Sequence, residues 1–214
     1  MFSTRFIIYL IVLFVTLVWG LVHFKKLSNS YKLLVLLVGY TFISETLSRF
    51  YYLFAATTFP LYHIIAVVSI ILNAMIYTKL SYNNKKSNSI IIGISAVFLT
   101  LCILNSVLVQ PINTFPSHSL MLHGLQSISL ALFSYLQMLK HPSEVSLTKQ
   151  PMFWLNTGNF VFYGLTFTIF SVFNVFYPTA TMASWVYWLI WMGNIFLYSC
   201  YFLAIHLNLS TKNE

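Results

Sequence analysis

Seven apolar runs, separated by short polar connections, follow one another along the 214 residues of this chain. The hydrocarbon core of a bilayer needs about 20 apolar residues per helix, and each run is about that long. Because only 7% of the residues are charged, the chain cannot cover the water-facing surface of a soluble domain. We therefore predict an all-α integral membrane protein, a single seven-span bundle over residues 1–214. The predicted spans are 6–24, 31–54, 59–80, 89–109, 118–139, 153–176 and 183–207.

The prolines and glycines agree with these boundaries. Each of the six prolines falls in a connection or at the start of a span, where no helical hydrogen bond is lost. Each of the seven glycines falls inside a span, where a small residue allows two helices to approach closely. In the first span Lys25 and Lys26 follow the apolar run in place of a small-residue cleavage site, so we expect an uncleaved anchor.

The basic residues predict the orientation of the bundle. Arg5 and Arg49 fall on one side of the predicted membrane and all the lysines on the other. The lysines are Lys25, Lys26, Lys32, Lys79, Lys85, Lys86, Lys140, Lys149 and Lys212. Basic connections stay in the cytoplasm, so we expect an outside N-terminus and a cytoplasmic C-terminus. The net charge of +8 is then a topology signal, with the lipid bilayer rather than nucleic acid as the partner.

The second span carries a polar stripe that lipid would not tolerate. Thr41, Glu45, Ser48 and Tyr52 follow helical spacing and share one face. Glu45 is the only acidic residue within a predicted span, and Arg49 lies one turn further on, where an ion pair is allowed. Intramembrane ionisable groups mark functional sites, so this face is expected to line the bundle interior or a wet cavity.

Further polar residues fall at the same depth, in the outer third of the membrane. The direction of each span places Tyr62 and His63 near the outer end of the third, His123 near that of the fifth and Asn174 near that of the sixth. Such residues at helix ends also meet headgroups or water in membrane proteins without any ligand, and that alternative stays open. The candidate ligand-binding residues are Glu45, Arg49, His63, His123, Tyr62 and Asn174.

Several chemistries can be tested on the residues. The last span contains no lysine, so it cannot form a retinal Schiff base. Glu45-x-x-x-Arg49 is faintly similar to the motif of the intramembrane CAAX-processing proteases, but Ser44 stands where they have a second glutamate. An intramembrane hydrolase stays a minor alternative. No catalytic residue, metal site or cofactor is predicted, and we do not expect an enzyme. A small-solute transporter is the other alternative, although no internal repeat or proline-broken span supports it.

Three segments resemble a known group of proteins. They are Leu61-Tyr62-His63, residues 153–158 (Phe-Trp-Leu-Asn-Thr-Gly) and Phe162-Tyr163-Gly164, together with Glu45. With them the chain resembles small seven-helix membrane proteins of Bacteroidetes-type bacteria, which are similar to the membrane part of some sensor histidine kinases. Ser69 stands where a second acidic residue would be expected in the third span. The resemblance implies a sensor-like module without established catalytic residues.

We therefore expect a receptor-like or sensor-like membrane module. It would bind a small ligand, an ion or a partner in a polar pocket on the outer side. Since the printed chain ends at Glu214 without a kinase or other output domain, we expect the signal to pass to a separate protein, such as a kinase in the membrane. The residues do not indicate an oligomeric state.

Overall fold

Long helices make up most of the described chain. The computed structural model describes residues 4–55, 57–81, 84–176 and 184–210, except for the side chains of 52, 53, 173–176 and 184. Within these residues there are seven α-helices. They are α1 (Thr4–Val22), α2 (Asn29–Phe54), α3 (Phe59–Leu80), α4 (Lys85–Leu104), α5 (Ser117–Lys140), α6 (Pro151–Phe176) and α7 (Ser184–Ser210).

Local sequence explains several helix ends. Pro60 lies in the first turn of α3 and Pro151 begins α6, positions where the missing N–H costs nothing. The side chain of Asn84 caps α4 by accepting a hydrogen bond from the Lys86 backbone N–H at 3.0 Å. A five-residue π-helix, η2 (Asn105–Val109), continues α4, and short 3₁₀ turns, η1 (Phe24–Lys26) and η3 (Leu147–Lys149), precede α2 and α6.

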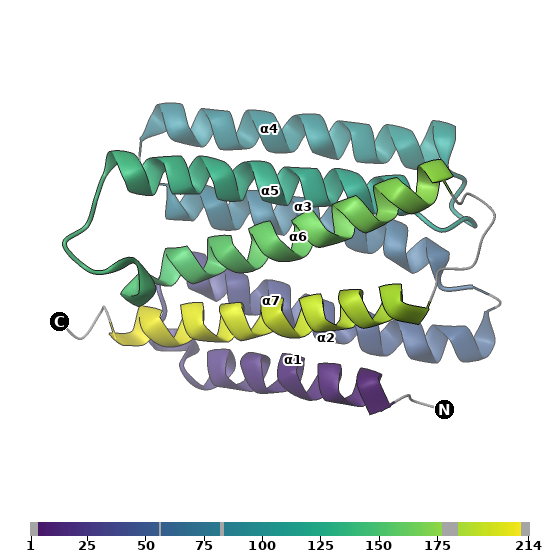
Figure 1. Cartoon of the computed structure of the whole chain (residues 1–214), viewed down its shortest axis with the longest axis horizontal. Coiled ribbons are helices and arrows are strands. Elements are labelled where there is room, and N and C mark those ends of the chain that lie inside the picture. The colour runs from purple at the N-terminus through teal and green to yellow at the C-terminus, as the bar shows by residue number, and fades with distance from the viewer. Residues whose placement is uncertain (1–3, 56, 82–83, 177–183, 211–214) are drawn as a thin grey trace.

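Six helices of the described chain are long and apolar enough to cross a membrane, so this is a multi-pass helical membrane protein. The six are α1, α2, α3, α4, α5 and α7. The remaining helix, α6, is 26 residues long and contains Asn156 and Asn159, and the side chains of its last four residues lie outside the described part of the chain. Both asparagines are 0% exposed, and α6 lies between α5 and α7 in the bundle (Figure 1).

Six of the seven helices, all except α4, form a ring. Following the contacts round the bundle, α1 packs on α2, α2 on α3, α3 on α5, α5 on α6, α6 on α7 and α7 again on α1. A contact between α2 and α7 crosses the ring. The remaining helix, α4, packs mainly against α3 and α5, at the edge of the bundle (Figure 1). The first and last helices of the chain are therefore neighbours.

The helix directions sort the basic residues between the two ends of the bundle. α1 begins and α2 ends at what we call the arginine end, with Arg5 and Arg49. The eight described lysines all lie at the opposite end, called the lysine end, where α1 ends and α2 begins. The ninth, Lys212, lies outside the described residues. The described chain begins with Thr4 at the arginine end and ends with Ser210 at the lysine end, so its two ends lie at opposite ends of the bundle (Figure 1).

The packing suits an apolar solvent. Large apolar side chains remain exposed along the helices, including Ile11, Phe14, Ile43, Leu47, Val97 and Leu132. Many polar side chains lie inside, including Asn73, His123, Gln126, Ser134 and Asn159. Lipid tails solvate the first set, whereas the second must find hydrogen-bond partners within the protein.

Candidate functional site

An open pocket of about 440 Å³ lies at the arginine end, between α1, α2 and α7. We call it the arginine pocket. Its lining residues are Arg5, Phe6, Tyr9, Glu45, Arg49, Tyr187, Ile190, Trp191 and Asn194. Three of them are charged, and they include both arginines of the chain and the only acidic residue of the predicted spans. Charged and aromatic groups thus converge on one hollow built from three helices.

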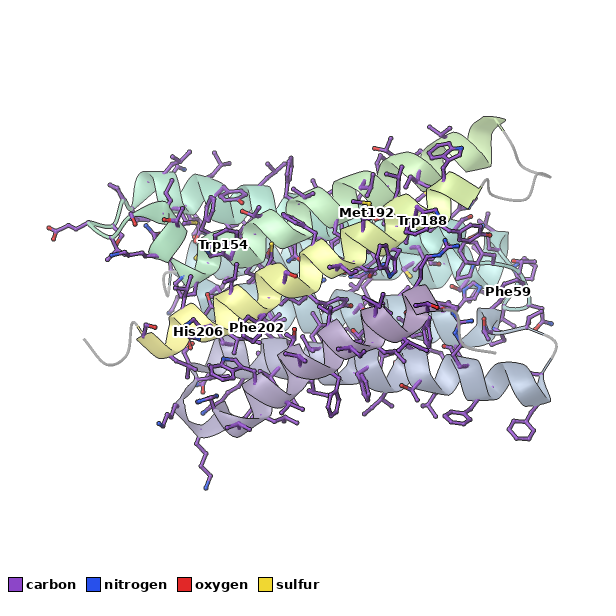
Figure 2. All side chains as sticks on the ribbon, turned by 60° about the horizontal axis from the view of Figure 1, so that its bottom comes forward. Phe59, Trp154, Trp188, Met192, Phe202 and His206 are labelled. Atoms are coloured by element: carbon purple, nitrogen blue, oxygen red, sulfur yellow. The ribbon has the colours of Figure 1, made fainter. Side chains whose placement is uncertain are left out.

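Aromatic rings hold both guanidinium groups in place. The Cζ atom of Arg49 lies 4.1 Å from the centroid of the Phe6 ring, which joins α2 to α1. The Cζ atom of Arg5 lies 4.3 Å from the centroid of the Trp188 ring, which joins α1 to α7. In addition, the indole Nε1–H of Trp191 donates to the Arg5 carbonyl oxygen at 2.7 Å. Figure 2 shows Trp188 on α7, near the arginine end. Stacking of this kind orients a cation while leaving its N–H donors available.

Glu45 is half-buried and faces the same pocket. Among the described residues it makes no ion pair, so the Glu45–Arg49 bridge that the spacing allows is not formed. Glu45 lies within electrostatic range of both Arg49 and Tyr62. Two guanidinium groups and one carboxylate leave the pocket with a net positive charge. The arrangement can therefore take up an acidic group and still offer one acceptor to a cation.

Tyr62 and His63, adjacent in sequence, point to different neighbours. Tyr62 lies beside Ser48 of α2, within range of Glu45 and Arg49. His63 is only 3% exposed, and its Nδ1 is 2.8 Å from the Ser106 hydroxyl in η2. Its Nε2 is 3.3 Å from the Thr114 carbonyl oxygen. Of this pair, only Tyr62 belongs with the charged residues of α2.

The π-helical turn organises a second polar cluster at the arginine end. The side-chain amide of Asn105 donates to Ser119 at 2.9 Å and to Gln110 at 3.2 Å. The oxygen of Gln110 also accepts from the backbone N–H of His118, which closes the turn onto the start of α5. Nearly every donor here is already partnered within the protein. These hydrogen bonds join the end of α4 to the start of α5, next to His63.

His123 lies deeper, in a third polar group. Its Nε2 is 3.0 Å from the Asn73 side-chain nitrogen, which also donates to the Ser127 hydroxyl at 3.1 Å. The ring of Tyr163 packs edge-on against His123 with centroids 4.8 Å apart. These contacts join α3, α5 and α6 and do not include a residue of the arginine pocket.

The six candidate residues are thus divided. Glu45, Arg49 and Tyr62 lie together, whereas His63 and His123 belong to separate networks. The side chain of Asn174 lies outside the described residues. Within the described part of the chain, no three His, Cys, Asp or Glu side chains come together as metal ligands. Glu45 and the histidines are therefore not arranged as the hydrolase alternative would require.

Sequence reasoning missed part of the pocket, above all Arg5. A signal for it was present, because Arg5 and Arg49 were the only basic residues assigned to their side of the membrane. Tyr187, Trp191 and Asn194 also form a stripe at helical spacing in α7, and their shared face turns out to line the pocket. Which helix would face this stripe could not be read from spacing alone.

Comparison of the chain with protein-family models, with curated proteins and with solved structures finds no match. The resemblance to the membrane part of sensor kinases therefore stays an expectation. What the chain does must be inferred from the chemistry of its pocket.

Proposed function

We propose that this chain is a receptor-like membrane module that binds a small ligand in the arginine pocket. The observation that carries this proposal is the convergence of Arg5, Arg49 and Glu45 on one open hollow. None of the three charges is neutralised by an ion pair within the described protein, so each is available to a ligand. We further propose that binding is communicated to a separate signalling protein in the membrane.

The pocket favours a zwitterionic ligand. Guanidinium groups form charge-assisted hydrogen bonds with carboxylate or phosphate, and Glu45 can accept from an ammonium group. The aromatic side chains of Phe6, Tyr9 and Trp191 offer apolar and cation-binding surface between these charges. A molecule that carries an acid, an amine and a ring, such as an aromatic amino acid, would satisfy all three features.

The proposed topology places the arginine pocket on the outer side. We infer that all seven helices span a bacterial inner membrane, with the N-terminus outside and the lysine end in the cytoplasm. The separation of eight lysines from two arginines supports this orientation through the retention of basic connections in the cytoplasm. The burial of Asn156 and Asn159 supports α6 as a span, because their polar groups are hidden from lipid.

Thermal unfolding of the purified protein in detergent tests the ligand proposal. Three probes separate its elements: L-phenylalanine carries both charges, benzoate only the acid and phenethylamine only the amine. We expect L-phenylalanine to raise the unfolding midpoint at the lowest concentration. Arg5→Gln and Arg49→Gln should each weaken the binding of L-phenylalanine and benzoate by about tenfold or more, the worth of one charged hydrogen bond.

Glu45→Gln provides the internal comparison. This variant should weaken the binding of L-phenylalanine but leave the binding of benzoate unchanged or tighter, because only the partner of the ammonium group is lost. Lys79→Gln, at the lysine end, is the matched control for the removal of one positive charge and should bind like the wild type. Equal midpoints with and without every probe would contradict the proposal. So would equal weakening by Lys79→Gln.

A second candidate function is small-solute transport, favoured by one observation. A stripe of buried polar side chains runs along α5: Ser119, His123, Gln126, Ser127, Ser134 and Gln137. Buried atoms of Gln126 and Gln137 have no partner in the structure, which in proteins commonly indicates bound water. Uptake of radiolabelled L-phenylalanine into proteoliposomes tests this candidate, with Gln126→Leu expected to abolish it. Binding without uptake would favour the receptor.

A further inference from the structure

A second and larger pocket, of about 870 Å³, lies at the lysine end and is separate from the arginine pocket. Lys140 and His141 at the end of α5 and Pro151 and Met152 at the start of α6 form one side. Tyr31 of α2 and Asn208 of α7 also line it. Four helices and the exposed connection between α5 and α6 thus meet around one open hollow at the lysine end.

The electrostatics of this lysine-end pocket favour an anion. Lys140 contributes a full positive charge, and the first turn of the 26-residue helix α6 contributes the positive end of its dipole. Of the N–H groups in that turn, Pro151 lacks one and Phe153 donates to the Gln150 carbonyl oxygen at 3.1 Å. Met152 lines the pocket within this turn. Helix N-termini next to a lysine are common phosphate sites.

Tyr31 supplies an independent indication of a ligand. Its side chain is only 4% exposed, yet it lines the pocket. Among the described residues its hydroxyl has no hydrogen-bond partner. The hydroxyl itself is not fully buried, so it is accessible from the pocket, where water or a ligand group can meet it. The Tyr31 hydroxyl can donate to a phosphate oxygen held by Lys140.

The surroundings of the pocket indicate that the phosphate belongs to a lipid. Leu136 and Leu139 precede Lys140 on α5 and are 55% and 77% exposed, so they face the hydrocarbon region. An acyl chain can lie along them while its headgroup enters the pocket. Basic pockets between membrane helices on the cytoplasmic side are a recognised class of anionic-lipid site.

We propose that the lysine-end pocket binds the phosphate headgroup of an anionic phospholipid, held by Lys140, Tyr31 and the N-terminus of α6. This inference is independent of the arginine pocket and its ligand, which lie at the other end of the bundle.

A titration of the purified full chain in detergent tests this inference. Dioctanoyl phosphatidylglycerol, dioctanoyl phosphatidylcholine and sodium phosphate are compared by the shift in the thermal unfolding midpoint. We expect the anionic lipid to stabilise the wild type at a lower concentration than either of the others. Lys140→Gln should raise its half-saturating concentration about fivefold. Tyr31→Phe keeps the ring and should raise it about threefold or more.

Lys85→Gln is the matched control, because Lys85 lies at the same end but outside the pocket. It should leave the half-saturating concentration unchanged. Equal weakening by Lys85→Gln would overturn the inference in favour of unspecific surface charge, and equal stabilisation by phosphatidylcholine would also overturn it. Sodium phosphate matching the lipid would show a site for free phosphate instead. If Lys140→Gln does not fold, Tyr31→Phe alone decides between these outcomes.

Discussion

The guanidinium of Arg49 lies over the ring of Phe6, with 4.1 Å between Cζ and the ring centroid. This contact joins α1 and α2 at the arginine end beside Glu45, although the two residues belong to different helices. It occupies the face of the guanidinium and leaves its edge for other partners. Arg49 therefore contributes to packing and to the pocket at the same time.

Phe6→Leu is expected to lower the stability of the bundle by about 0.5–1 kcal/mol, since it removes the ring beneath the cation while keeping an apolar side chain. Thermal unfolding in detergent measures the change. Phe50→Leu on α2 is the control, because Phe50 is 53% exposed and should tolerate the same exchange. An equal loss of stability in both variants would mean that the ring contact with Arg49 does not contribute to stability.

Gly158→Ala is expected to destabilise the protein by about 1–3 kcal/mol. A Cβ at this position would lie 2.8 Å from the Cys200 Cβ and 3.3 Å from a methyl group of Leu197 on α7. Gly164→Ala, in the same helix, meets nothing within 4 Å and should be neutral or stabilising through its better helix propensity. Unfolding in mixed SDS micelles compares the two. A stable Gly158→Ala variant would show that α6 and α7 are further apart.

Asn159 links α3 and α7 through two tyrosines. Its side-chain nitrogen donates to the Tyr77 hydroxyl at 2.9 Å, and its oxygen accepts from the Tyr201 hydroxyl. A double-mutant cycle of Asn159→Ala with Tyr77→Phe is expected to give a coupling energy of about 0.6–1.7 kcal/mol. Additive effects on unfolding would argue against the hydrogen bond.

The proposed orientation predicts which loops a membrane-impermeant maleimide can reach in intact cells. Asn113→Cys, exposed at the arginine end, should be labelled without permeabilisation, and Ser143→Cys, exposed at the lysine end, only after it. The native thiols of Cys102 and Cys200 are 0% and 1% exposed, so the folded wild type should remain unlabelled. The reverse pattern would invert the topology and move the arginine pocket to the cytoplasm.

The spans could be predicted closely because hydropathy and proline placement are local signals. The third predicted span, 59–80, coincides with α3 (Phe59–Leu80). The fourth was predicted to begin at residue 89, whereas α4 begins at Lys85, because its first turn is polar and is fixed by the Asn84 cap rather than by hydropathy. Local patterns thus locate a helix well and its first turn less well.

The site was only partly predictable, since it depends on which helices are neighbours. Spacing placed Glu45 and Arg49 on one face of α2, but the predicted depth grouped them with His63 and His123. The ring order separates these histidines by turning them toward η2, α3 and α6. Arg5 joins Glu45 because α1 packs against both α2 and α7, a contact that no single segment encodes.

The position of α7 next to α1 has a consequence for how the chain matures. Walls of the arginine pocket come from α1, α2 and α7, and Trp191 joins two of them by donating to the backbone carbonyl of Arg5. Membrane insertion proceeds from the N-terminus, so Glu45 enters the bilayer long before α7 exists to cover it. Until α7 is in place, the side of Glu45 that faces the pocket is not covered by α7. The arginine pocket is therefore complete only once α7 has packed against α1.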